Sequence, residues 1–488
     1  ILMWSFVTLG LIIFTFAGGK IVANLPLTTL VRLIGLIIFA TVIGTLISVK
    51  LALRLDRYFA VRLFLTAFAI RLITGITIGL YLLETKGTPL FQGDTELFQK
   101  QALEIIGGEI QWIPGAFYGP SIIYASIYNL VGDNSPFLSL VPNILLSALT
   151  PVFVWRIVQE LKISESIARN SAWLVTLLPV TVIYGSTHLK EGTTAFVTTL
   201  LLYLVVTKFY RPYYLTVMMA LPFLFVVFLY RDRLGLPLLF LFFIGMGITN
   251  KSKRFSLISL ILWLVIPCVL AILGLRLGLW SSKQGAIERV FLTGWYILEN
   301  QHRSLFSPIA FLSGFKANPL IILLFSPISA LYILLLPLPW FVLNEDMYFE
   351  ANLLSIANTA WLILIPLFFL GCVHLWRQPN KVQRLPVLLS LGGLLAMAFS
   401  LDELGMMGRH KEIFMPFMLI ATGSGWENFR SWQTSSKSGL IAITILYFSL
   451  ISVLYLCGKG WLIFQAFIIP ILLCFLILVM TYIRIANK

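Results

Sequence analysis

The amino-acid sequence predicts an all-α protein, a polytopic bundle of transmembrane helices. Of its 488 residues, 59% are hydrophobic and only 11% are charged, too few charges to cover the surface of a water-soluble protein of this length. The apolar residues also form blocks of about 20 residues, the length that crosses a hydrocarbon core as a helix. Clear cases are 28–49, 60–83, 255–280 and 461–483. Because every backbone polar group in lipid must be paired within the protein, such blocks are expected to be helical.

Basic residues are concentrated in short connectors between the apolar blocks, at 50–62, 156–169, 208–211, 251–254, 377–384, 430–437 and 484–488. Such clusters are typical of cytoplasmic loops facing anionic lipid, so the net charge of +15 indicates membrane lipids and no nucleic acid as the partner. Alternating crossings between the clusters give about 14 spans with both ends inside. Residues 319–343 contain Pro327, Pro337 and Pro339, and they fit this count only as a re-entrant or interfacial helix.

The same topology places several charged residues on the outer face, where basic residues oppose the usual bias. They come from well-separated connectors: Asp94 and Glu96; Lys190 and Glu191; Arg231, Asp232 and Arg233; and Arg409, His410, Lys411 and Glu412. Basic groups that converge beside a carboxylate can hold a phosphate while the carboxylate acts as a base. The alternative is that each group is a solvated helix end.

Other polar residues carry weaker signals. Arg71 lies inside an apolar span, where a charge is costly and usually has a partner or a role; we expect it either to pair with an acidic residue or to extend to the interface. Glu345, Asp346 and Glu350 form an acidic patch that is either a solvated loop or a holder of a divalent cation, so the cofactor remains open. No metal site is assigned, since the cysteines lack metal-ligand spacing; they are Cys268, Cys372, Cys457 and Cys474.

The order of short motifs along the chain is a further observation. A span with an internal arginine is followed by Gly-Asp-x-x-x-Phe at 93–98, then by Tyr-Gly-Pro at 118–120, which opens an apolar helix at 121–131. Pro-Asn at 142–143, Leu-Leu-Pro at 177–179, Tyr-Gly-Ser at 184–186 and Leu-Lys-Glu at 189–191 come next. Gly-Arg-His-Lys at 408–411 precedes a late apolar run.

Together these motifs resemble the GT-C superfamily of integral membrane glycosyltransferases, which includes protein O-mannosyltransferases and the lipid A aminoarabinose transferase. The resemblance is nearest to bacterial members associated with surface polysaccharides and covers most of residues 60–425. It therefore divides the chain into two N-terminal transmembrane helices (1–59), a GT-C-like catalytic core with outer loops 84–135 and 281–318 (60–425), and C-terminal transmembrane helices (426–488).

The resemblance implies an inverting enzyme of the bacterial inner membrane, with its active site on the extracytoplasmic face. Such enzymes move a sugar from a polyprenyl-phosphate-linked lipid donor to a glycan, lipid or protein acceptor. An acidic residue in the first outer loop acts as general base, and Asp94 matches it, with Glu96 as the next candidate. Many members have adjacent acids there, whereas these two are separated by one residue and would face nearly opposite sides of a helix.

Two other functions fit the same sequence features. A polysaccharide polymerase or ligase with a polyprenyl-diphosphate donor would use similar basic residues on the outer face. A flippase or transporter for lipid-linked glycans is the non-enzymatic alternative. Transporters often show two related halves and helices broken near the middle of the membrane, and no repeated half is seen in this sequence.

Overall fold

A computed structural model describes residues 25–52, 56–91, 93–109, 118–207, 213–230, 349–398 and 411–431, together with the single positions 15, 238, 241, 242, 245, 330, 333 and 334. All regular structure in these residues is helical. The helices are α2 (Leu27–Leu51), α3 (Arg57–Lys86), α4 (Asp94–Gly107), α5 (Tyr118–Val131), α6 (Pro136–Glu160), α7 (Glu165–Leu177), α8 (Pro179–Ser186), α9 (Lys190–Thr207), α10 (Tyr213–Tyr230), α15 (Phe349–Trp376), α16 (Leu385–Ala398) and α18 (Met415–Ser431), with the 3₁₀ turns η7 (Lys381–Arg384) and η8 (Lys411–Ile413).

Several of these helices are long and apolar enough to cross a membrane. Four meet this test within the described residues, Leu27–Leu51, Arg57–Lys86, Pro136–Glu160 and Ile356–Trp376. A fifth crossing is formed if α7 and α8, bent by 56° at a short break, count as one span. The prediction of an all-α membrane fold is thus confirmed at this level. The segments 255–280, 281–318 and 461–483 lie outside the described residues, and so does 319–343 apart from three positions.

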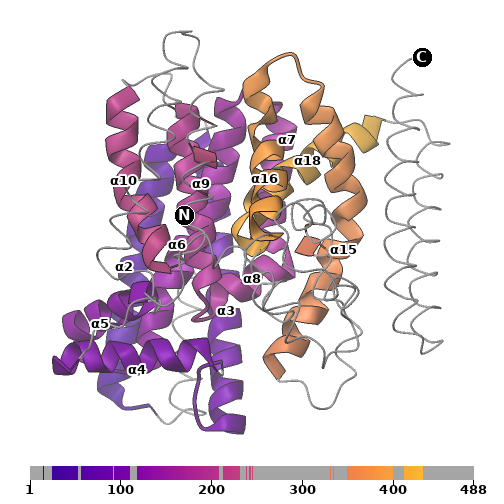
Figure 1. The fold of residues 1–488 in the computed structure, drawn as a ribbon. Coiled ribbons are helices and arrows are strands. Elements are labelled where there is room, and N and C mark those ends of the chain that lie inside the picture. Colours follow the sequence, from indigo (N-terminus) through magenta and orange to yellow (C-terminus); the bar gives the residue numbers. More distant parts are fainter. Residues whose placement is uncertain are drawn as a thin grey trace, which may run out of the picture.

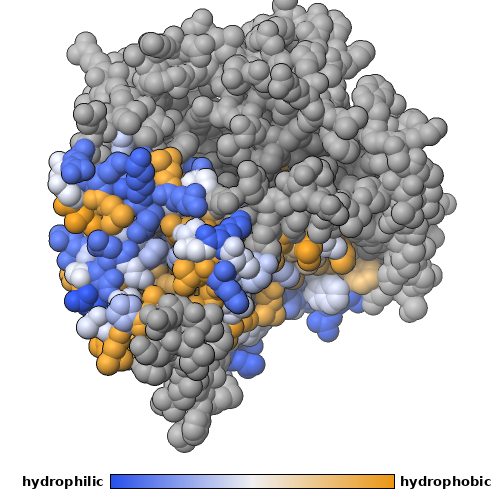
Figure 2. Space-filling view, turned by 90° about the horizontal axis from the view of Figure 1, so that it is seen from below, coloured by the Kyte–Doolittle hydropathy of each residue, from blue (hydrophilic) through white to orange (hydrophobic). Residues whose placement is uncertain are grey.

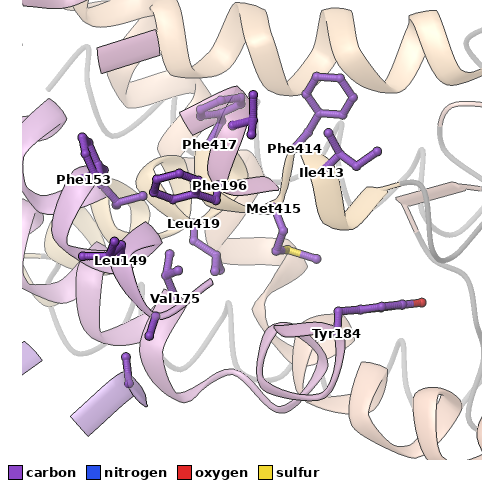
Figure 3. Packing of buried hydrophobic residues seen from close by; sticks show 14 of the residues in the cluster. Leu149, Phe153, Val175, Tyr184, Phe196, Ile413, Phe414, Met415, Phe417 and Leu419 are labelled. Atoms are coloured by element: carbon purple, nitrogen blue, oxygen red, sulfur yellow. The ribbon is translucent and has the colours of Figure 1, made fainter. Parts of the chain in front are cut away.

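The helices α2, α3, α6, α9 and α10 stand side by side, and α4 and α5 run across one end of them (Figure 1). The helices α15, α16 and α18 form the other side of the bundle, with α18 packed on both α15 and α7. The apolar core joins segments that are far apart in the chain. Phe153 of α6 packs edge-on against Phe196 of α9 at 5.6 Å between ring centroids, beside Phe417 of α18 (Figure 3).

The helix α2 shows how the bundle divides between core and surface. Leu30, Leu33 and Ile37 are buried against α3 and α6, whereas Phe39 and Val42 are exposed although they are apolar. An exposed apolar stripe on a helix of this length is expected where the helix faces lipid tails.

The two ends of the bundle carry different residues. At one end lie Arg57, the first residue of α3, and Arg384. Gln383, next to Arg384, donates a hydrogen bond there to the Leu161 carbonyl (3.1 Å). The opposite end carries α4 and α5 and the starts of α6 and α9 (Figure 1). The segment 84–135, expected as an outer loop, is therefore largely helical where it is described. Figure 2 looks onto this end, where hydrophilic residues lie beside apolar ones.

Small residues allow the closest helix contacts. A Cβ atom added to Gly371 of α15 would lie 1.6 Å from the Ala421 carbonyl oxygen of α18, and one added to Gly425 of α18 would lie 1.9 Å from the Leu367 carbonyl oxygen. Because both obstacles are backbone atoms, no side-chain movement can relieve them. Close approach of backbones at small residues is a main source of helix association in membranes.

This packing predicts that Gly371→Ala lowers the melting temperature of the detergent-purified protein, since the two helices must separate. Overpacking of this kind costs roughly 1–3 kcal/mol. Gly35→Ala is the matched control, because a Cβ atom there meets nothing within 4 Å. Tryptophan fluorescence during heating measures both variants, and equal melting temperatures would contradict the close contact of α15 and α18.

Candidate functional site

Two of the charged residues selected from the sequence form an ion pair. The Lys190 ammonium nitrogen lies 3.3 Å from Oδ2 of Asp94, although the residues are far apart in the chain. Asp94 is the first residue of α4 and Lys190 the first of α9, so the pair joins the starts of two helices. The Lys190 side chain is 2% exposed and that of Asp94 is 30% exposed. The pair therefore lies at the edge of the bundle, with the carboxylate on the open side.

The position of Asp94 follows from the turn before α4. Gly93 has φ 83° and ψ −112°, a conformation that residues with a Cβ atom rarely adopt. Its carbonyl oxygen accepts the first hydrogen bond of α4, from the Leu97 amide (3.1 Å). Glu96, the other predicted acid, is exposed on α4. Asp94 and Glu96 are thus separated on α4, as their spacing in the sequence predicted.

Lys190 is positioned by a short break between α8 and α9. Three carbonyl groups of residues 187–189 accept hydrogen bonds from side chains of other helices. The Asn143 amide group of α6 donates to the Thr187 carbonyl, and to that of Leu189 at 3.4 Å. The Tyr124 hydroxyl group of α5 donates to the His188 carbonyl at 2.9 Å. Buried carbonyl groups need such partners, so α5 and α6 fix the start of α9.

Further hydrogen bonds hold this break in place. The Thr193 hydroxyl group donates to Oδ1 of Asn143 (2.6 Å), which orients the amide group toward residues 187–189. Nε2 of His188 lies 2.7 Å from the Pro136 carbonyl oxygen at the start of α6. Burial lowers the pKa of the His188 imidazole to about 4, so the neutral ring donates this bond through Nε2. His188 is therefore a fixed structural group at pH 7.

A second break, between α7 and α8, explains the intramembrane arginine. Pro179 has no N–H group, so the Val175 carbonyl lacks its intrahelical donor four residues on. Nη2 of Arg71 donates to this carbonyl at 3.0 Å, and the Thr181 hydroxyl group does so at 3.0 Å. Nη1 of Arg71 lies 3.5 Å from the Thr176 carbonyl oxygen. Arg71 is 1% exposed, so it stays inside the bundle and does not extend to the interface.

The same region gathers other buried charges, which we call the buried charge cluster: Arg71, Glu191, Lys411 and Glu412. They come from α3, α9 and η8, and their exposed fractions are 1%, 0%, 0% and 3%. Glu412 interacts electrostatically with each of the other three. The turn η8 is anchored to α9 by a hydrogen bond from the Thr198 hydroxyl group to the Ile413 carbonyl (3.0 Å). Lys190, Glu191 and Lys411 are thus buried groups, not solvated helix ends.

Several predicted site residues lie outside the described part of the chain. These are Arg231, Arg233, Arg409 and His410, and the acidic patch is described only at the backbone of Glu350. Within the described residues, no group of three His, Cys, Asp or Glu side chains could hold a metal ion.

The sequence did not mark Asn143 and Tyr124 as site residues, although each lies in or beside a recognised motif, and it placed Glu412 only among the charges of the outer connectors. The missing information was spatial, since Asn143 and Tyr124 act on carbonyl groups of another segment and Glu412 faces residues of α3 and α9. The one available signal, Pro179, concerned a different carbonyl group, that of Val175, which Arg71 and Thr181 satisfy.

No family model matches the chain, and no curated protein is significantly similar to it in sequence.

The role of Arg71 as a donor to the broken helix predicts energetic coupling between Arg71 and Pro179. Pro179→Ala restores an N–H group that can bond to the Val175 carbonyl, so Arg71→Met should cost less in that background. The difference is expected to be roughly 1.5–3 kcal/mol, the value of one hydrogen bond to a charged group, because the Thr181 hydroxyl group still donates to this carbonyl. Melting curves of the parent, both single variants and the double variant give the coupling.

Pro366→Ala is the matched control, because Pro366 lies within α15, where Arg71 donates no hydrogen bond to a carbonyl group. Its effect should add to that of Arg71→Met. If the effects of Pro179→Ala and Arg71→Met were also additive, Arg71 would have no part in holding the break between α7 and α8.

Proposed function

We propose that the chain is a GT-C-like membrane glycosyltransferase of about 14 spans, a count based on the distribution of basic residues. It would take a sugar from a polyprenyl-phosphate-linked donor on the extracytoplasmic face of a bacterial inner membrane and pass it to a glycan, lipid or protein acceptor. The observation that supports the proposal most directly is the contact of Asp94 with Lys190 at the start of α4 and α9.

The residues around this contact suit such a reaction. An ammonium group beside a carboxylate favours its ionised form, which is the form that accepts a proton. Asp94 would take the proton of the acceptor hydroxyl group as that oxygen attacks the anomeric carbon. The bond from this carbon to the phosphate oxygen breaks, the configuration inverts, and polyprenyl phosphate leaves. General base catalysis of this kind typically accelerates a reaction by about 10²–10⁴-fold.

Lys190 is suited to the phosphate side of the reaction. Its ammonium nitrogen is held 5.4 Å from the centroid of the Phe98 ring and beside Asp94, in a largely buried setting where charges interact strongly. A fixed positive charge of this kind stabilises the negative charge that develops on a departing phosphate. In the proposal, Arg231, Arg233, Arg409 and His410 supply further phosphate contacts, whereas Lys411 and Glu191, which are fully buried, act on the site only through their charge.

A specific observation favours a second candidate, a flippase or transporter for lipid-linked glycans. The α7–α8 pair is bent by 56°, and Arg71 with the rest of the buried charge cluster lies beside that bend. Broken helices and buried ionisable groups are common in transporters. A transporter would move a fluorescent lipid-linked glycan between the leaflets of a vesicle without forming a new glycosidic bond, so the two functions are separable by product analysis.

The proposed mechanism predicts that Asp94→Asn lowers kcat by about 10²–10⁴-fold, because the side chain keeps its size but no longer accepts a proton. The assay uses the purified full chain with a panel of radiolabelled polyprenyl-phosphate sugars and an envelope acceptor fraction. Glu96→Gln is the matched control: it removes a carboxylate from the same helical turn, exposed rather than paired, and should leave kcat within a factor of about three.

Loss of kcat in Glu96→Gln together with normal turnover in Asp94→Asn would reverse the two roles. Sugar transfer that is equal in all three proteins would remove both acids from catalysis. Vesicle flipping without transfer in the parent protein would favour the transporter.

A further inference from the structure

Glu412 is a carboxyl group enclosed by the helix bundle, in the turn η8 just before α18. The residue is 3% exposed, and its Oε2 atom has no hydrogen-bond partner. A carboxylate without hydrogen bonds is among the costliest groups to bury, and it normally avoids this cost by taking up a proton.

Arg71 and Lys411, the basic residues of the buried charge cluster, donate their hydrogen bonds to groups other than Glu412. The terminal nitrogens of Arg71 donate to the carbonyl groups of Val175 and Thr176, at 3.0 and 3.5 Å. The Lys411 ammonium group donates to Oδ1 of Asn358 at 2.6 Å. Across the described ranges, no ion pair joins Glu412 to either cation. Their positive charges lower the cost of an ionised Glu412 only from a distance.

Glu191 acts in the opposite direction. It is 0% exposed and interacts electrostatically with Glu412 as a like charge. Two carboxyl groups that share a buried region do not readily ionise together. Glu191 also interacts with Tyr124, whose hydroxyl group bonds to residue 188 at the end of the bundle that carries α4 and α5. Glu191 also directly follows Lys190 in α9, so it adjoins the Asp94–Lys190 pair along the chain.

The remaining elements packed against η8 contribute little charge. The turn contacts α8, α9, α16 and α18. The helix α16 has no ionisable side chain, and the ionisable residues of α18, Glu427 and Arg430, lie in its last turns. In α8 the ionisable side chain is that of Tyr184, which extends away from the apolar side chains labelled with it (Figure 3). Arg71, Glu191 and Lys411 thus dominate the field at Glu412 among the described residues.

We propose that Glu412 is a proton-binding site: its carboxyl group carries a proton in the resting protein and exchanges that proton with water. The exchange is a single proton transfer, from the carboxylic acid to a water molecule, which leaves a carboxylate and a hydronium ion. No other bond changes. Protonation adds one positive charge to the buried charge cluster relative to its ionised form. This assignment is independent of whether the chain transfers or transports a sugar.

The electrostatics agree with this geometry. Burial raises the pKa of the Glu412 carboxyl group from 4.5 to about 8, while Lys411 and Arg71 lower it and Glu191 raises it. The group therefore holds its proton at pH 7 and titrates in the mildly alkaline range.

Infrared spectroscopy of the full chain in lipid nanodiscs tests the proposal. A protonated carboxylic acid has a carbonyl stretching band that a carboxylate lacks. We expect such a band at pH 7, lost with a midpoint near pH 8. The band should shift when glutamate is ¹³C-labelled in the otherwise unchanged protein, and it should be absent from Glu412→Gln. Glu427→Gln on α18 is the matched control and should keep it.

Substitutions of the charged neighbours test which groups shift the pKa of Glu412, because each should move the titration midpoint in a known direction. Glu191→Gln removes the like charge and should lower the midpoint, whereas Arg71→Met removes a positive charge and should raise it, each by roughly one pH unit or more. Should Glu412→Gln fail to fold, the isotope shift and these two variants still decide the matter. A titrating band that is unmoved by ¹³C-glutamate, or that persists in folded Glu412→Gln, would overturn the proposal. So would midpoints that neither neighbour alters.

Protonation of Glu412 also makes the thermal stability of the protein depend on pH. The unfolded chain releases the Glu412 proton near pH 4.5 and the folded chain near pH 8, so the folded state binds more protons between these values. Stability from this group is then fully present below pH 4.5 and is lost as the pH rises to 8. The melting temperature of Glu412→Gln should fall less over this interval than that of the parent, and parallel curves would contradict the assignment.

Discussion

Inside this helix bundle, the interrupted helices leave backbone groups that need hydrogen-bond partners, and this need decides where the charged residues lie. Where a helix is interrupted away from water, its freed carbonyl groups must find donors in other segments. The chain interrupts its helices at Pro179 and again at residues 187–189. Arg71 and Thr181 supply donors at the first break, and Asn143 and Tyr124 supply them at the second.

These donors determine where the charged residues lie. Because α5 and α6 hold the second break, α9 begins inside the bundle, and its first residues Lys190 and Glu191 are buried. Lys190 then meets Asp94 at the start of α4, while Glu191 faces inward toward Glu412. The Asp94–Lys190 pair and the buried charge cluster are therefore two parts of one polar region, the first partly open and the second enclosed. A substrate phosphate at Lys190 and a proton at Glu412 would each change the charge that the other experiences.

Much of the fold was predictable because it follows from composition. The apolar blocks 28–49 and 60–83 became α2 and α3, since only helices satisfy the backbone of such segments in lipid. The sequence also selected Lys190, because basic residues on the predicted outer face are unusual, and Asp94, because the resemblance implies an acid in the first outer loop. The ion pair between Asp94 and Lys190 could not be predicted, because it depends on how Asn143 holds residues 187–189. The partners of Arg71 were equally hidden, because a carbonyl group freed by a proline has no signature in the arginine's own segment.

We propose that Lys190 and Asp94 form a site for the phosphate and the acceptor of a polyprenyl-phosphate-dependent reaction. Electron cryomicroscopy of the full chain in lipid nanodiscs with added polyprenyl phosphate tests this role. We expect phosphate density within hydrogen-bonding distance of the Lys190 ammonium group, with the Asp94 carboxylate facing the same space. Phosphate density bound away from the starts of α4 and α9, with the Asp94–Lys190 pair unchanged, would contradict it.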